Sequence, residues 1–171
     1  MKKTLKSILA LTLALVAVLA FASCGSKKQL TVSKLEESLK TVDSSLSLTE
    51  SSSGVYTAST SYEYTVETNG SKGVKSVKIT MSGVDVYTLK SESSLNKSLS
   101  KSAGQMSRVD LAISNCVLMA GALRTAVGGS SATKEESISL FASQTAWTVD
   151  SWTIQAEYSG SSTVILTATA K

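Results

Sequence analysis

The residue types that could do chemistry in this 171-residue chain are serine paired with lysine, adjacent carboxylates and two cysteines, because histidine is absent. A serine nucleophile needs a base beside it, and lysine can replace histidine in that role. Ser-x-x-Lys occurs at Ser94, Ser98 and Ser131, which is the number that a chain this rich in serine and lysine gives by chance. The companion Lys-Thr-Gly motif of penicillin-binding enzymes is absent from the sequence. These pairs therefore do not indicate a hydrolase.

Adjacent carboxylates are the second chemical candidate, because two acids can share the acid and base roles of glycoside hydrolysis. The chain has two such pairs, Glu36-Glu37 and Glu135-Glu136. Each falls in the first turn of a predicted helix, where the helix dipole favours acids, so both have a structural explanation. The sequence holds no His/Cys cluster, calcium loop or Gly-rich phosphate loop. We therefore expect a non-enzymatic protein without a metal or cofactor.

The two cysteines lie in different surroundings. Cys116 sits in an apolar, helix-forming run, so we expect a buried and inert thiol. Cys24 follows a lysine-rich start and an apolar run over residues 8–21. As a helix this run would span about 21 Å, less than the roughly 30 Å of a hydrocarbon core. The leader is therefore typical of an export signal.

The segment Phe21-Ala22-Ser23-Cys24 resembles the lipobox of bacterial lipoproteins, with a large apolar residue, two small residues and a cysteine. This resemblance covers the leader alone. It implies that residues 1–23 are a signal peptide, that the Cys24 sulfur carries a diacylglyceryl group, and that residues 24–30 form a lipidated tether. Two alternatives stay open. Ala20-Phe21-Ala22 also fits the cleavage site of a secreted protein, and an uncleaved leader would itself be the anchor.

The net charge of the chain limits the kinds of partner that it is expected to bind. The chain has 17 Lys and Arg against 13 Asp and Glu, but three of the lysines lie in the leader, so the remainder is nearly neutral. A nucleic-acid partner would require a basic stripe, which the sequence lacks. The expected partners are a membrane, bound through the N-terminal lipid, and an envelope protein or glycan. The expected location is the outer face of the cell membrane or the outer membrane.

Hydrophobic periodicity predicts one domain over residues 31–171. Ser33-Lys34-Leu35-Glu36 matches a capping box and predicts a helix that ends between Val42 and Leu46. Alternation predicts a strand over residues 55–68 and, after an Asn-Gly loop, a return strand over residues 74–89 with a bend at Gly83.

In the second half of the chain, helices are again followed by a hairpin. Residues 91–101 are predicted as a loop or weak helix, and residues 106–127 as a long central core helix. Asp110 and Arg124 enclose too few residues in that helix for it to cross a membrane. Thr133 starts a capping box and a short helix, and alternation then predicts strands that begin near Trp152 and Val164.

These elements predict an α+β fold: an antiparallel four-stranded sheet built from two hairpins, with helices packed on one face. The aromatic residues form a candidate interaction surface. By parity the two tryptophans are placed on opposite faces of one strand, so that at least one is exposed. The competing interpretation is that the rings pack beneath the helices. The candidate residues are Tyr56, Tyr62, Tyr64, Trp147 and Trp152.

Three functional hypotheses follow from the sequence. The leading one is a lipid-anchored envelope protein that acts as a non-enzymatic binding or structural module. The alternative is a small-ligand carrier or transporter accessory lipoprotein, which needs a cavity between sheet and helices. An envelope hydrolase with an unrecognised serine or carboxylate site is the least favoured.

Overall fold

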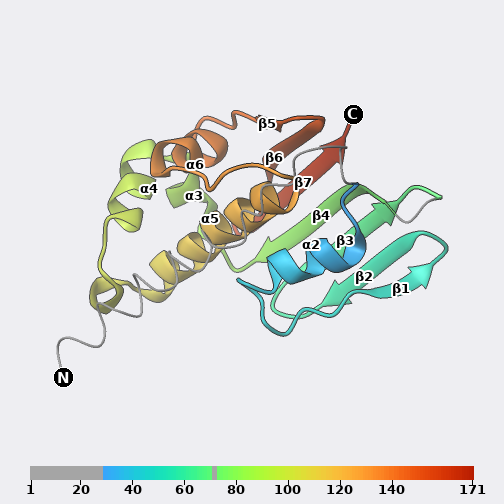
Figure 1. The fold of residues 1–171 in the computed structure, drawn as a ribbon. Coiled ribbons are helices and arrows are strands. Elements are labelled where there is room, and N and C mark those ends of the chain that lie inside the picture. Colours follow the sequence, from blue (N-terminus) through green and yellow to red (C-terminus); the bar gives the residue numbers. More distant parts are fainter. Residues whose placement is uncertain (1–28, 71–72) are drawn as a thin grey trace, which may run out of the picture.

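The computed structural model describes residues 29–70 and 73–171, so the leader, Cys24 and most of the predicted tether lie outside the described residues. The described residues form one antiparallel sheet and a layer of helices (Figure 1). The strands are β1 (Thr49–Ser52), β2 (Val55–Ser59), β3 (Glu63–Thr68), β4 (Val74–Ser82), β5 (Trp147–Val149), β6 (Trp152–Ser159) and β7 (Thr163–Ala170). The helices are α2 (Val32–Leu39), α3 (Val86–Lys90), α4 (Glu92–Leu99), α5 (Arg108–Ala126) and α6 (Lys134–Phe141), with a 3₁₀ turn at Ala103–Gln105.

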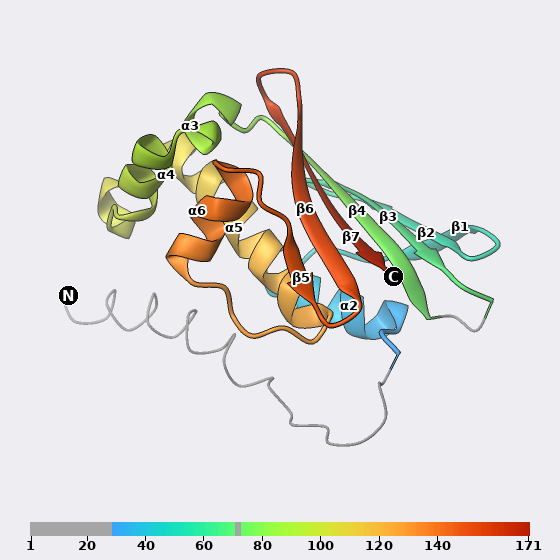
Figure 2. The same cartoon turned by 90° about the horizontal axis from the view of Figure 1, so that it is seen from above.

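The helices lie on one side of the sheet, and the other side carries no described helix (Figure 2). The core fills the space between the two layers. Helix α5 is central to it, because Ile113, Cys116, Met119 and Leu123 are fully buried. By length and composition alone α5 would suffice to cross a membrane, but in the described fold one face of the helix is buried in the core. The prediction of a central core helix is confirmed.

The predicted α+β fold with an antiparallel sheet is confirmed, but the prediction of four strands is wrong. The described sheet has seven strands in the order β1-β2-β3-β4-β7-β6-β5. The two predicted hairpins meet through β4 and β7, where Ile79 is opposite Leu166. Two of the three additional strands arise because two segments that alternate continuously in sequence are each broken by a tight turn. The third is β1, which pairs with β2 across a turn at Gly54, where φ is 76°.

The first of these turns divides the strand predicted over residues 55–68. The chain reverses between Ser59 and Glu63, so that Ala58 of β2 pairs with Tyr64 of β3. The amide of Thr60 donates to the carbonyl oxygen of Tyr62 at 2.9 Å and closes the turn. Ala58 before the turn and Tyr64 after it are an even number of positions apart and lie on the same face. The alternation of apolar and polar residues therefore continues through the turn without a break.

The second turn separates β5 from β6. Asp150 adopts a left-handed backbone with φ of 49°, which Asp tolerates better than most residues, and Val149 then pairs with Trp152. The strand predicted over residues 74–89 also ends early, at Ser82. Gly83 has φ of 76°, and the Asp85 side chain caps α3 by accepting from the amides of Tyr87 and Thr88.

The helix predictions differ from the structure mainly at their ends. Thr31, and not Ser33, caps α2, and this helix stops at Leu39 before the predicted end. The segment predicted as a loop or weak helix forms α4. The capping box at Thr133 is confirmed, with reciprocal bonds to Glu136 at the start of α6.

Candidate functional site

The two tryptophans of the candidate surface are buried. Because the Asp150 turn brings Val149 opposite Trp152, both rings lie on the inward face of the sheet, and the prediction of opposite faces is wrong. The Trp147 indole N–H donates to the carbonyl oxygen of Glu136 at 3.2 Å, and the Arg124 guanidinium lies 5.0 Å from the ring centroid. These contacts tie β5 to α5 and α6. Both tryptophans are 8% exposed, so neither presents a ring surface to a ligand.

Two of the three tyrosines belong to a polar cluster that supports the β2–β3 turn. Tyr64 is buried, and Tyr62 is half-buried with its ring 6.4 Å from that of Tyr64, edge to face. The Asp43 carboxylate accepts from the Tyr64 hydroxyl at 2.9 Å, from the Ser45 hydroxyl at 2.6 Å and from the Thr60 hydroxyl. The cluster therefore holds the segment after α2 against the β2–β3 turn and the start of β3.

Burial and hydrogen bonding together determine the protonation states of Asp43 and Tyr64 in this cluster. Burial by itself would raise the pKa of Asp43, but the bonds from Ser45, Thr60 and Tyr64 outweigh it and hold the pKa below its usual value. Burial, together with the neighbouring Asp43 charge, raises the pKa of Tyr64 well above that of a free phenol. Asp43 is thus a charged acceptor and Tyr64 a neutral donor, an arrangement suited to structural support and not to proton transfer.

One of the Ser-x-x-Lys pairs forms a real cluster, but the cluster is structural. The Ser98 hydroxyl donates to Asp110 at 2.7 Å, and the Lys101 ammonium donates to both oxygens of that carboxylate at 2.7 and 2.8 Å. Lys101, Ser107 and Ser98, in that order, lower the pKa of Asp110. Both Ser98 and Lys101 direct their protons at Asp110, so this lysine is not placed to remove a proton from the serine.

The adjacent carboxylates are also engaged. Glu36 pairs with Lys40 at 2.5 Å and accepts from the amide of Leu48 at 2.9 Å; because α2 begins at Val32, Glu36 lies beyond its first turn. Glu136 pairs with Arg124 at 2.8 Å and caps α6. The pKa values of Glu36 and Glu136 are both lowered, chiefly by Lys40 and Arg124 respectively. Neither Glu36 nor Glu136 has the raised pKa of a catalytic acid.

Cys116 is buried in α5, and burial raises the pKa of its thiol to about 12. At neutral pH the thiolate, which is the reactive form, is therefore scarce. Within residues 29–70 and 73–171, no three His, Cys, Asp or Glu side chains gather to hold a metal ion. Cys24, the predicted lipidation site, lies outside these residues.

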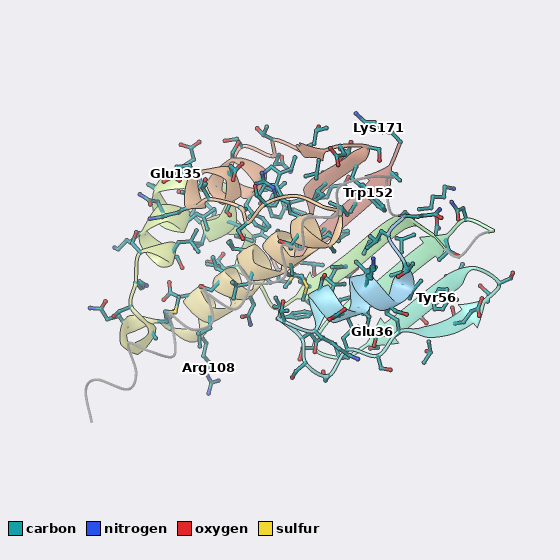
Figure 3. All side chains as sticks on the ribbon, in the orientation of Figure 1. Glu36, Tyr56, Arg108, Glu135, Trp152 and Lys171 are labelled. Atoms are coloured by element: carbon teal, nitrogen blue, oxygen red, sulfur yellow. The ribbon has the colours of Figure 1, made fainter. Side chains whose placement is uncertain are left out.

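Tyr56 differs from the other candidate aromatics because its half-buried side chain lines a surface groove. Figure 3 labels Tyr56 of β2 together with Glu36 of α2, another residue of the groove lining. The groove has a volume of about 470 Å³ and is open to solvent. A smaller hollow of about 360 Å³ also has Tyr56 in its lining, together with residues of the β1–β2 turn. The groove is lined by Gln29, Thr31, Val32, Ser33, Glu36, Leu48, Tyr56 and Gly73.

The groove opens where the chain enters the described fold. The amide of Val74 donates to the Leu30 carbonyl oxygen at 2.7 Å, and Thr31 forms a β-bridge with Gly73. A side chain at Gly73 would collide with Gln29, because its Cβ would lie 1.9 Å from the Gln29 amide nitrogen. The backbone bond to Leu30 and the bridge at Thr31 hold the first described residues beside Gly73 and the start of β4, and Gln29 and Gly73 line one wall of the groove.

No protein-family model, curated protein or solved structure matches this chain, so its function is argued from geometry. Sequence reasoning singled out Tyr56 and, as part of a carboxylate pair, Glu36, but it missed the other groove residues. They come from segments separated by up to about forty positions and have no shared motif. The Asn-Gly loop signal was the nearest indication, since the loop that it predicts carries Gly73 at its end.

Proposed function

We propose that this protein is a lipid-anchored, non-enzymatic binding module of the bacterial cell envelope, and that the Tyr56 groove binds an envelope glycan. The observation that carries the proposal is the lining of the groove: one aromatic ring among hydroxyl, amide and carboxylate groups, beside the segment that leads back to Cys24. A ligand held there would lie close to the membrane to which the lipid attaches the protein.

The chemistry of the groove suits a sugar. The Tyr56 ring offers an apolar face against which the C–H groups of a sugar ring can pack. Ser33 and Thr31 offer hydroxyl groups, and Gln29 an amide that both donates and accepts. Small-ligand sites combine apolar surface with a few convergent polar groups in just this way, at volumes of about 300–1,000 Å³. The open shape favours an extended or chain-like ligand over an enclosed small molecule.

The non-enzymatic part of the proposal is supported by the polar clusters. Among the described residues, the strongly perturbed acids are engaged in caps, turns or ion pairs, and their pKa values are lowered. A general acid needs the opposite shift. Of the three Ser-x-x-Lys pairs, the one with a close-range network directs its protons at Asp110.

The alternative of a small-ligand carrier receives no support from the described core. Such a carrier would need space between the sheet and the helices. That region is occupied by large, fully buried side chains, among them Tyr64, Phe141 and Met81. The Tyr56 groove lies between α2 and β2 but is open to solvent, and the smaller hollow lies beside the β1–β2 turn, so neither is an enclosed cavity within this core.

Binding to soluble peptidoglycan fragments, measured by titration calorimetry, tests the glycan proposal. We expect Tyr56→Ala to reduce affinity at least tenfold, because the ring supplies the main apolar contact. Tyr87→Ala is the matched control, since Tyr87 is 82% exposed on α3 and lies outside the groove. Equal binding by both variants, or absence of binding by the unmodified protein to glycans of the producing cell, would overturn the proposal.

The anchor has a separate test, mass spectrometry of the N-terminal peptide from membranes of the native cell. A diacylglyceryl group on Cys24 is the expected result. A soluble product that starts at Ser23 would instead indicate a secreted protein and would remove the membrane from the proposal.

A further inference from the structure

The outward face of α5 carries an unusual concentration of apolar side chains. Four large apolar residues are strongly exposed in the described part of the chain, and three of them, Val109, Leu111 and Leu118, belong to this helix. Leu111 and Leu118 are seven positions apart and therefore share one face. They are 49% and 48% exposed, whereas Ile113 and Cys116 on the opposite side are fully buried. We call Leu111 and Leu118 the outer stripe of α5.

This stripe belongs to the same layer as the point where the chain enters the fold. Helix α2 packs alongside α5, and both lie on the same side of the sheet (Figures 1 and 2). Gln29 comes just before the Thr31 cap of α2. Four residues, 25–28, separate the predicted lipidated cysteine from Gln29, and the five residue steps from Cys24 to Gln29 span at most about 18 Å in an extended chain. The helix layer of an anchored molecule is therefore held close to the bilayer.

We propose that the helix layer faces the membrane and that the outer stripe of α5 rests on the lipid surface, an inference that depends on the proposed lipid anchor. Exposed apolar side chains on a helix can enter the boundary between headgroups and acyl chains. Arg108, exposed at the start of the same helix, supplies a cation for headgroup phosphates. On α2 the exposed charges are mixed, with Lys34 against Glu37, so the apolar contact provides most of the attraction.

Because the N-terminal lipid already holds the protein at the membrane, the small contact made by the outer stripe is sufficient to orient the domain. Two half-exposed leucines would not hold a free protein on a membrane. Once a lipid holds the domain, however, the contact is intramolecular, and short flexible linkers give effective concentrations in the millimolar range. The stripe would then orient the domain and not recruit it. In this orientation the groove beside α2 would open near the membrane surface.

Site-specific fluorescence on vesicles tests this orientation. Residues 24–171 contain every described element, so this form is produced with Cys24→Ser and an N-terminal hexahistidine tag that binds nickel-chelating lipids. The chain has no histidine of its own, so the tag is the only histidine attachment. An environment-sensitive dye is placed on Leu118→Cys or, as matched control, on Lys78→Cys, which is exposed on the sheet face without helices. Cys116 is buried and stays unlabelled.

On vesicles of phosphatidylcholine and phosphatidylglycerol, we expect the dye at position 118 to shift to shorter wavelength. Quenchers attached to the lipids should reduce its emission, and the dye at position 78 should not respond. Adding Leu111→Ser should weaken the response at 118. Equal responses at both positions, or none at 118, would overturn the proposal. So would a shift without vesicles that grows with protein concentration, because a second copy would then cover the stripe. Since the tag replaces the lipid, none of these results bears on native lipidation.

Discussion

The two edges of the sheet carry the same sequence pattern but differ in their surroundings. In both β2 and β6, apolar and polar residues alternate, with an aromatic residue near the start, Tyr56 or Trp152. Trp152 is buried, whereas Tyr56 is only half-buried and borders a groove. The difference arises because α5 and α6 pack against the strands on the β6 side, while β1 and most of β2 extend beyond the cover of α2 (Figure 1). Alternation identifies the inward face, but the helices decide whether that face becomes core or binding surface.

The largest expected effect is at the covered edge. Trp147→Ala should lower the free energy of unfolding by about 3–5 kcal/mol, because it leaves a cavity beneath Arg124 and α6. Chemical denaturation measures this change. Trp147→Phe is the control that keeps most of the apolar volume while it removes the indole N–H. A loss below about 1 kcal/mol for the alanine variant would mean that this edge is no better packed than the Tyr56 edge.

The Asp43 cluster near the open edge should give the next largest effect. Asp43→Ala should cost about 2–3 kcal/mol, because the buried Tyr64 hydroxyl loses its charged acceptor and the β2–β3 turn loses its support. Asp43→Asn should cost less, since the amide oxygen can still accept. Unfolding monitored by tyrosine fluorescence would record both. Equal stability of the alanine variant and the unmodified protein would mean that Asp43 does not stabilise the β2–β3 turn.

The same cluster predicts a pH dependence with a defined sign. The pKa of Asp43 is lowered in the folded state, so the unfolded chain takes up its proton first as the pH falls. The contribution of Asp43 to stability is therefore complete above about pH 4 and is lost below it. Denaturation midpoints measured between neutral and acidic pH should fall less steeply for Asp43→Asn. The pKa values of Asp110 and Glu136 are also lowered in the folded state, so the stability of Asp43→Asn should still fall with decreasing pH.

A smaller effect is expected for the contact of Arg124 with Trp147. A double-mutant cycle of Arg124→Met and Trp147→Leu should give a coupling energy of about 1 kcal/mol, as for a partly buried cation over an indole ring. Raised salt should reduce the separate pairing of Arg124 with Glu136 more than this coupling. A coupling energy near zero would mean that Arg124 stabilises the fold only through its ion pair with Glu136.

The smallest effect on stability is expected at the open edge. Tyr56→Ala should change the free energy of unfolding by less than about 1 kcal/mol, because the ring borders solvent. The same variant should lose glycan binding, whereas the tryptophan variants should affect binding only through folding. A large loss of stability in Tyr56→Ala would indicate that the groove is part of the core and would remove the contrast between the two edges.

Parts of the fold could be predicted because their signals are local. The capping box at Thr133, the apolar face of α5 and the alternation in β6 and β7 each depend on neighbouring residues, and each is confirmed. The turn at Asp150 had a usable signal too, since Asp-Ser favours turns, although the continuous alternation concealed it. The candidate site was only partly predictable. Tyr56 was identified by its strand face, but Gln29 and Gly73 join it only through folding.

By itself the sequence determined the lipobox-like leader, the type of most elements and which side chains share a face within one strand or helix, because these depend on composition and short-range spacing. The tertiary structure decided where the strands turn and which inward rings are covered. The β2–β3 turn shows why. Ser59, Thr60 and Ser61 carry no Gly, Pro or Asn signal, and the turn is held by Asp43 from a distant segment. Whether an aromatic ring becomes core or groove depends likewise on tertiary packing. Tyr56 borders an open groove beside the first turns of α2, whereas Trp147 lies against Arg124 and α6.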